Sequence, residues 1–280
     1  MRNRSQILAE NLIKWGCPDV VVTNNDPADF TELTHLFDVI LTDVPCSGEG
    51  MFRKDQVAVD EWSVENVDIC WKRQRRILAD IWPTLKPGGI LIYSTCTFNR
   101  EEDEDNVSWI AKELGADVLP VSVEEEWGIT GNLTGKDFPV YRFLPHRTKG
   151  EGFFLAVLRK HEGDLEKIAL RSEKKKKGKD NKQPLVVPKE AKSWLKNSSA
   201  YSYVMKDANV VAFPKAYEQE YVLLQHYLKV IHAGVTLAEI KGKDLIPHHS
   251  LAMSTELLEG VFPTAELSYE QAIAYLRKEG

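Results

Sequence analysis

Short apolar runs alternate with longer amphipathic stretches in the first part of the chain. Residues 20–22 and 38–44 are rich in β-branched side chains and end at turn-forming residues, a pattern typical of buried strands. Between 65 and 85, apolar side chains recur at helical spacing, and Pro-Gly-Gly at 87–89 is expected to end that helix. Residues 90–93 form the next strand-like run.

The alternation continues on both sides of these elements. An amphipathic helix is predicted over 2–16, and an acidic helix over 100–114. Another strand is expected at 118–123, and 140–144 with 153–158 have the pattern of an antiparallel pair. Strand–helix alternation with an antiparallel finish predicts an α/β domain with a doubly wound sheet.

A change of composition follows this domain. Residues 161–192 contain ten Lys or Arg against six Asp or Glu with almost no periodicity, so they are predicted to be a solvated basic linker. A second, smaller unit is expected at 193–280. It has β-rich patterns at 209–213 and at 230–240, the latter interrupted at Gly234.

The bulk composition excludes several classes of protein. A formal net charge of −6 gives no overall nucleic-acid footprint, so any contact with RNA must come from local patches. No apolar run approaches the ~18 residues that a membrane span needs. The four cysteines include no Cys-x-x-Cys pair, which argues against a zinc site and a thiol-redox motif. We expect a cytoplasmic monomer that binds no metal and no membrane.

Two of the cysteines end strand-like runs and have small, polar or turn-forming neighbours. Cys46 follows Pro45, and Cys96 lies between two threonines. Small residues allow a flat ligand to approach the backbone closely. Cys17 and Cys70 are expected to be buried apolar side chains, Cys70 because it lies on the apolar stripe of its predicted helix.

The segment after Cys96 has a second feature of interest. Asn99 is followed three residues later by Glu102, the spacing of a capping box, so Glu102 is expected to cap a helix rather than to take part in catalysis. Cys96 would then lie at a strand end just ahead of a helix N-terminus. Thiolates are favoured there, and open α/β sheets bind ligands at the ends of their strands.

These motifs resemble those of one family. Residues 43–54 (DVPCSGEGMFRK) and 93–106 (YSTCTFNREEDEDN) closely resemble the two cysteine motifs of the Sun/Fmu-type (Nop/Sun) RNA cytosine-5 methyltransferases. Residues 85–89 (LKPGG) and 145–154 (PHRTKGEGFF) are similar to that family too. Residues 242–254 (GKDLIPHHSLAMS) resemble the extra domain of its bacterial ribosomal-RNA branch.

The resemblance implies a fold, a cofactor and a partner. Residues 1–160 would form part of a Rossmann-like methyltransferase sheet that binds S-adenosylmethionine. Residues 193–280 would form a small α+β, PUA-like RNA-binding domain. The partner would be RNA, namely that of the small ribosomal subunit.

The family's chemistry explains the use of two thiols. Carbon 5 of cytosine is a poor nucleophile until a thiolate adds at carbon 6, after which carbon 5 can attack the sulfonium methyl of S-adenosylmethionine. The resemblance makes Cys96 the nucleophile and Cys46 the residue that assists release. DNA cytosine methyltransferases use a Pro-Cys nucleophile instead, so the reverse assignment stays open.

Other residues take roles from the same resemblance. Asp43 and Pro45 would lie at the cofactor and base site, and Asp26 would contact the adenine of the cofactor. The residues alone fit strand-end and Asx turns equally well. Arg53 and Lys54 would bind RNA phosphate and position a loop, although a solvated face fits them too.

The family's glycine-rich cofactor loop has no counterpart in this sequence. Met1 falls where the family has already passed its first two strands, so we expect an internal fragment of a longer enzyme, whose strands at 20–22 and 38–44 have unpaired edges. The alternative is a catalytically inactive RNA-binding or ribosome-assembly protein derived from this fold. The retention of both cysteine motifs favours the methyltransferase.

Without the glycine-rich loop, this chain is expected to bind S-adenosylmethionine weakly or not at all. Calorimetric titration of the cofactor into the purified chain measures this directly. A tight, stoichiometric complex would show instead that Asp26, Asp43 and their neighbours suffice to hold the cofactor.

Overall fold

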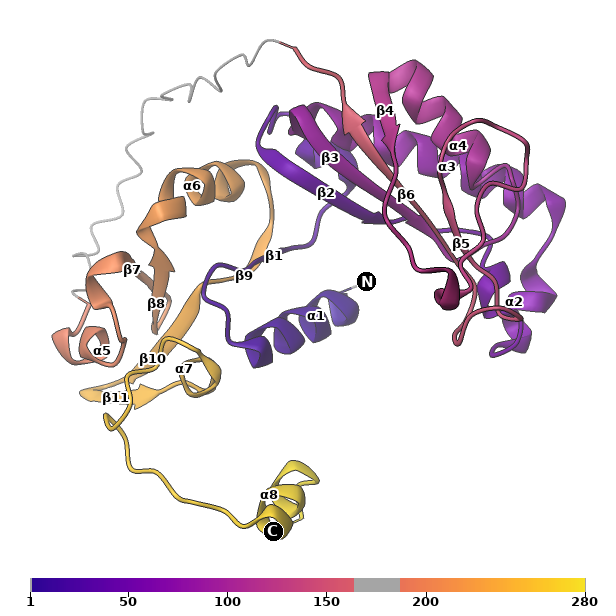
Figure 1. Ribbon diagram of the computed structural model, residues 1–280. Helices are drawn as coiled ribbons and strands as arrows, with labels where there is room; N and C mark the ends of the chain where they lie inside the picture. The colour runs from indigo at the N-terminus through magenta and orange to yellow at the C-terminus, as the bar shows by residue number, and fades with distance from the viewer. Residues whose placement is uncertain (1, 164–186, 280) are drawn as a thin grey trace. The chain divides into compact units, whose positions relative to one another are not determined.

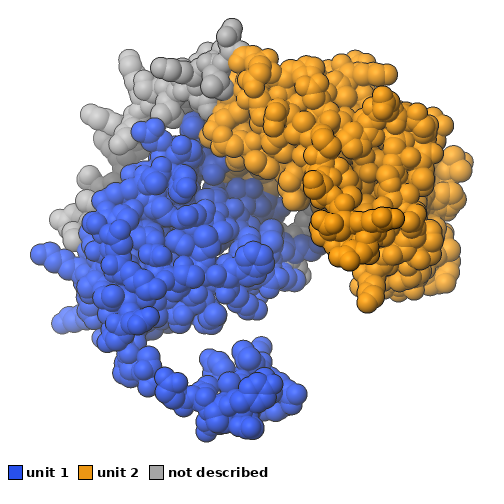
Figure 2. All heavy atoms as spheres, viewed as in Figure 1, with its two compact units in different colours: residues 1–24, 174–225, 229–280 blue, residues 25–173, 226–228 orange. Residues whose placement is uncertain are grey.

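The computed structural model describes residues 2–163 and 187–279, which form two compact units. The unit shown in orange in Figure 2 contains the described residues of 25–163 with 226–228. The blue unit contains those of 2–24, 187–225 and 229–279. Most of the basic linker predicted at 161–192 lies outside the described residues.

A mixed sheet of five strands forms the centre of the unit that is orange in Figure 2. Its strands are labelled β2 to β6 in Figure 1. Its strands are β2 (Phe37–Asp43), β3 (Leu85–Thr95), β4 (Ala116–Leu119), β5 (Tyr141–Phe143) and β6 (Phe153–Lys160). β2 and β3 are parallel neighbours, whereas β6 pairs antiparallel with β3, β4 and β5. The antiparallel pair predicted at 140–144 and 153–158 is therefore confirmed, as is the α/β class.

The helical segments of this unit are η1 (Pro27–Phe30), η2 (Glu49–Met51), α2 (Gln56–Glu61), α3 (Val64–Ile81), η3 (Trp82–Thr84), α4 (Glu104–Trp109), η4 (Ile110–Gly115) and η5 (Glu125–Trp127). Of these, α3, η3, α4 and η4 contribute buried side chains to the apolar cluster on the sheet. Leu78 of α3 and Ile110 of η4 share one buried cluster with Tyr93 of β3 and Phe154 of β6. The helical periodicity of the sequence thus corresponds to the face of α3 that packs on the sheet.

Two predicted helix boundaries were wrong. The helix expected to reach Leu85 ends at Ile81, and Pro-Gly-Gly at 87–89 lies inside β3 rather than stopping a helix. Gly89 has no room for a side chain, because a Cβ atom there would lie 2.8 Å from the Lys86 carbonyl oxygen. The acidic helix expected from residue 100 begins at Glu104.

The strand predicted at 20–22 is present as β1 (Val21–Thr23), but its place differs from the expectation. β1 pairs antiparallel with β9 (Val230–Ala233) in the blue unit and not with the five-stranded sheet. One of its edges is therefore paired, whereas the other has no strand partner among the described residues. The expectation was right for β2, which is the terminal strand of its sheet within the described residues and exposes Val39 and Leu41.

The blue unit contains a four-stranded antiparallel sheet in the order β11-β10-β8-β7. Its strands are β7 (Tyr201–Lys206), β8 (Asn209–Pro214), β10 (Val235–Lys241) and β11 (Asp244–Pro247). Its helices are α1 (Arg2–Trp15), α5 (Lys189–Ser193), η6 (Ser198–Ala200), η7 (Lys215–Tyr217), α6 (Glu218–Tyr227, whose last two residues fall in the orange unit), α7 (His249–Met253) and α8 (Tyr269–Leu276). The predicted interruption at Gly234 is confirmed, since it separates β9 from β10 with a φ of 65°.

One buried ion-pair cluster in the orange unit links β5 to the start of α4. Arg142 of β5 is only 3% exposed and pairs with Asp103 and Glu104, whose side chains are fully buried. The same guanidinium donates a hydrogen bond of 2.9 Å to the carbonyl oxygen of Phe98. Burial raises the pKa of Asp103 well above its ordinary value, and the charge of Arg142 partly offsets this.

Replacing Arg142 by Met is expected to lower the free energy of unfolding by about 3–5 kcal/mol, because two carboxylates would lose their buried cation. Denaturant titration measures this loss. Arg159→Met on the exposed side of β6 is the matched control and is expected to change stability by less than about 0.5 kcal/mol. Equal effects of the two changes would contradict a stabilising role for the cluster.

Candidate active site

The parallel strands β2 and β3 bring the two strand-end cysteines together. Asp43 pairs with Ser94 in register, and the Val44 N–H donates to the Ser94 carbonyl oxygen at 3.2 Å. Cys46 and Cys96 therefore leave the same edge of the sheet, and their sulfur atoms are 2.6 Å apart. The sequence predicted a strand-end position for each cysteine; the sulfur contact shows that they form one site.

Glycines allow the two cysteine loops to approach each other. The Gly50 N–H donates to the Cys96 carbonyl oxygen at 2.8 Å, and the Gly152 N–H donates to the Gly50 carbonyl oxygen at 3.3 Å. A Cβ atom on Gly50 would lie 2.5 Å from the Gly152 oxygen, and one on Gly152 would lie 2.0 Å from the Phe98 ring. Only glycine fits at these two positions.

The two thiols differ in their acidity. The hydrogen bond between them, together with burial, raises the pKa of Cys46 far above its ordinary value. The same hydrogen bond lowers the pKa of Cys96, although burial and the negative charge of Asp43 oppose this. Cys96 is therefore the more acidic of the two thiols and the better nucleophile.

The other two cysteines lie elsewhere. Cys70 is buried on α3, as predicted, and burial raises its pKa to about 11. Cys17 is exposed, so the prediction of a buried apolar side chain was wrong for it. It directly follows Gly16, the residue after α1, where the sequence has no hydrophobic periodicity that would indicate burial.

Glu102 does not cap a helix as the sequence suggested. The Asn99 side-chain oxygen does accept the Glu102 N–H at 2.9 Å, but α4 begins two residues later. The Glu102 carboxylate is fully buried and accepts hydrogen bonds from the Ser47 N–H, the Gln74 amide and the Asn99 amide. Burial raises its pKa. Sequence spacing could not reveal this, because Ser47 and Gln74 are distant in the chain.

Glu49 is a second carboxylate that the sequence did not single out. It is 8% exposed and accepts hydrogen bonds of 2.7 Å from the Thr97 hydroxyl and from the Phe98 N–H. The Trp62 indole N–H and the Asn99 amide also donate to it. The sequence shows that Glu49 lies three residues after Cys46, but it does not show that Glu49 is buried, because this burial depends on contacts with the Cys96 segment.

The predicted cofactor residues lie in two places in the orange unit: Asp43 and Pro45 at the end of β2, and Asp26 at the start of η1. Asp43 and Pro45 are exposed at the end of β2, and Asp43 is close enough to Cys96 to affect its pKa. Asp26 caps η1 by accepting the Ala28 N–H at 3.2 Å, and it pairs with Arg76 at 3.2 Å. Asp26 therefore makes the Asx-type contact expected from the sequence alone, while its side chain stays 57% exposed.

The predicted RNA-binding pair is exposed beside the cysteine loops. Arg53 donates to the carbonyl oxygens of Pro145 and Gly150 at 3.4 and 3.3 Å and lies 3.7 Å from the Glu151 carboxylate. Lys54, the next residue, is exposed in the same turn. Arg53 thus contacts the loop between β5 and β6.

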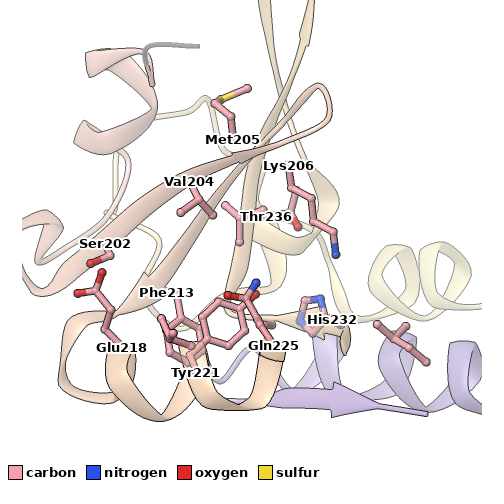
Figure 3. Close-up of a pocket in the computed structure, with 14 residues that line it drawn as sticks. Ser202, Val204, Met205, Lys206, Phe213, Glu218, Tyr221, Gln225, His232 and Thr236 are labelled. Atoms are coloured by element: carbon pink, nitrogen blue, oxygen red, sulfur yellow. The ribbon is translucent and has the colours of Figure 1, made fainter. Parts of the chain in front are cut away.

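The blue unit contains a cavity of its own, of about 350 Å³ (Figure 3). Its wall includes Phe213 and Tyr221, whose rings stack with centroids 4.3 Å apart, together with His232. In the described parts of the chain, no cluster of His, Cys, Asp or Glu could hold a metal ion. Among the helices of these same parts, none has the length and apolarity that a membrane span requires.

Comparison with known proteins gives concordant matches. The family model described as 16S rRNA methyltransferase RsmB/F matches residues 1–159. The ribosomal RNA small subunit methyltransferase F of Aliivibrio fischeri is 31% identical over 281 residues, covering 96% of this chain and 57% of that protein. The protein of the same name from Klebsiella pneumoniae is 39% identical over 162 residues, covering 56% of this chain and 33% of that protein.

A solved structure is similar as well. NSun6 from Pyrococcus horikoshii, solved with SFG, has a TM-score of 0.50 and 29% sequence identity, over 58% of this chain and 40% of that one. The chain thus spans little more than half the length of the relative from Aliivibrio fischeri, the longest of these matches.

Cys46→Ala is expected to slow alkylation of Cys96 by iodoacetamide at neutral pH, because loss of the thiol donor raises the pKa of Cys96 and lowers its thiolate fraction. The rates of variant and wild type should converge at alkaline pH, where Cys96 is ionised in both. Mass spectrometry of each cysteine peptide measures the rates, with the exposed Cys17 as internal reference.

Cys46→Ser keeps a hydroxyl donor and should therefore give an intermediate rate. Faster alkylation of Cys96 in Cys46→Ala at neutral pH would mean that Cys46 merely shields Cys96.

Proposed function

Because this chain belongs to the 16S rRNA methyltransferase RsmB/F family, we propose that it methylates carbon 5 of a cytosine in the RNA of the small ribosomal subunit through a covalent cysteine adduct. The observation that supports this best is the contact of 2.6 Å between Cys46 and Cys96 at the ends of parallel strands. A thiolate beside a thiol is suited to reversible addition to an electron-poor ring.

In the proposed mechanism, the Cys96 thiolate forms a bond to carbon 6 of the cytosine. The electron pair of the 5,6 double bond then moves toward carbon 5, which becomes nucleophilic. S-adenosylmethionine would supply the methyl group: carbon 5 would bond to it as the methyl–sulfur bond breaks, and S-adenosylhomocysteine would leave. A base takes the proton from carbon 5, the double bond re-forms, and the carbon–sulfur bond breaks.

Cys46 is suited to the last of these steps. Its protonated thiol faces the Cys96 sulfur and can donate a hydrogen bond to the departing thiolate. The target base has to leave its stack to reach Cys96, as in other enzymes that modify bases. The lowered pKa of Cys96 supports Cys96 as the nucleophile rather than Cys46.

The residues at the end of β2 fit the proposed cofactor in their chemistry. Asp43 presents an exposed carboxylate beside the nucleophile, and carboxylates accept hydrogen bonds from amino and hydroxyl groups. We assign Asp43 and Pro45 to the methyl-donor side of the site. The contacts of Asp26 with Ala28 and Arg76 both use Oδ1, so its Oδ2 could accept a hydrogen bond from the adenine amine.

We assign RNA contacts to both parts of the chain. Arg53 and Lys54 are exposed cations near the cysteine loops, where a phosphate next to the target base would lie. The match of the family model to residues 1–159 supports a catalytic part over 1–160. Residues 193–280, beyond the basic linker at 161–192, would form a PUA-like RNA-binding domain. The protein would act in the cytoplasm as a monomer.

RNA that contains 5-azacytidine tests the proposal without the cofactor, because its ring nitrogen at position 5 activates carbon 6 for thiolate addition. Wild type and Cys46→Ser are expected to form a protein–RNA adduct that survives denaturing electrophoresis. Cys96→Ser should reduce this adduct at least about a hundredfold, since it removes the nucleophile. In Cys46→Ser the adduct should persist longer after a chase with unmodified RNA.

An adduct in Cys96→Ser but not in Cys46→Ser would reverse the assignment of the two cysteines. Binding of RNA by the wild type without any adduct would favour the inactive RNA-binding or ribosome-assembly protein instead.

A further inference from the structure

Two buried carboxylates link the cysteine loops in opposite directions. Glu102 lies six residues after Cys96, yet its carboxylate accepts the backbone N–H of Ser47, the residue next to Cys46, at 3.1 Å. Glu49 lies three residues after Cys46, yet its carboxylate accepts the backbone N–H of Phe98, two residues after Cys96, at 2.7 Å. Each loop is therefore held by an acidic residue of the other segment.

Further contacts strengthen each half of this arrangement. On the Cys96 side, the Thr97 hydroxyl donates to Glu49 at 2.7 Å. On the Cys46 side, the Gln74 amide donates to Glu102 at 2.6 Å and to the Pro45 carbonyl oxygen at 3.0 Å. Pro45 and Ser47 flank Cys46, so contacts from Gln74 and Glu102 fix the backbone on both sides of that cysteine.

One amide serves both carboxylates. The Asn99 amide nitrogen lies 2.8 Å from a Glu102 oxygen and 3.1 Å from a Glu49 oxygen. The partners named for both residues are neutral N–H or O–H donors, so each carboxylate is stabilised by directed dipoles. Such bonds need accurate geometry, because a buried carboxylate loses much of its stabilisation when a donor moves away.

We propose that Glu49 and Glu102 are crossed positioning residues, with Glu102 setting the position of Cys46 and Glu49 setting the position of Cys96. Neither carboxylate touches the sulfur atoms in the contacts described, so both act through the loop backbone. Each glutamate thus acts on the cysteine loop that it contacts in space and not on the cysteine that is nearest to it in the sequence. The roles in catalysis rest on the proposed function, whereas the crossed contacts themselves do not.

Aspartate variants test this most directly. Glu102→Asp and Glu49→Asp keep the negative charge, which for Glu102 raises the pKa of Cys96, and withdraw the oxygens by one methylene. Glu101→Asp is the matched control, because Glu101 is the exposed neighbour of Glu102. Circular dichroism checks folding, and the Gln variants, which keep the side-chain length, replace any Asp variant that does not fold.

Amide hydrogen exchange gives the readout that needs no RNA. Glu102→Asp is expected to speed exchange about tenfold at Ser47 but not at Phe98, and Glu49→Asp should do the reverse. Glu101→Asp should change neither. Unchanged exchange at both amides, or equal changes at both in each variant, would overturn the proposal.

Adduct kinetics with 5-azacytidine RNA give the functional readout in a double-mutant design. Glu102→Asp should lengthen the adduct lifetime about fivefold in wild type but have no further effect in Cys46→Ser, because it acts through Cys46. Glu49→Asp should slow adduct formation by the same factor in both backgrounds, because it acts through Cys96. If the two glutamates had only a general structural role, the effects of Glu102→Asp and of Glu49→Asp would each add to the effect of Cys46→Ser.

The reverse pattern, in which Glu49→Asp has no further effect once Cys46 is replaced by Ser, would also overturn the proposal. If the wild type forms no adduct, the proposed function fails, while the exchange experiment still decides whether the carboxylates position the loops.

Discussion

A carboxylate that is removed from water must be surrounded by donors or cations, and the orange unit depends on this constraint. Glu49, Glu102, Asp103 and Glu104 are all buried near the ends of β2 and β3. Asp103 and Glu104 pair with Arg142, and the other two take N–H and O–H donors from the loops. Because the Ser47 and Phe98 N–H donors belong to the backbone around the cysteines, satisfying Glu102 and Glu49 also fixes the site.

The contact between the two thiols explains why chemically identical side chains differ in acidity. The hydrogen bond between their sulfur atoms is the largest cause of both pKa shifts, and it raises the pKa of Cys46 while it lowers that of Cys96. Burial adds to the rise at Cys46 and opposes the fall at Cys96. The difference therefore depends on the fold that brings the two loops together, and neither cysteine motif alone indicates it.

The sequence predicted the site where local pattern determines structure, and failed where distant contacts do. Cys46 and Cys96 could be placed at strand ends because apolar runs and small neighbours are local signals. The pairing of β1 with β9 joins residues about two hundred positions apart, and no local hydrophobic pattern predicts it. Glu102 has the spacing of a cap, but its burial depends on Ser47 and Gln74, which only the fold brings near.

The close approach of Gly50, Gly152 and Phe98 has a consequence for the divergence of related sequences. A side chain at position 50 would meet the backbone at 152, and one at 152 would meet the ring at 98. Amino-acid substitutions at these three positions therefore cannot accumulate independently of one another. The positions belong to three separate segments, and none of them holds a group that reacts in the proposed mechanism. Substitution should be tolerated only as a concerted change, so the trio is expected to vary together or not at all as such proteins diverge.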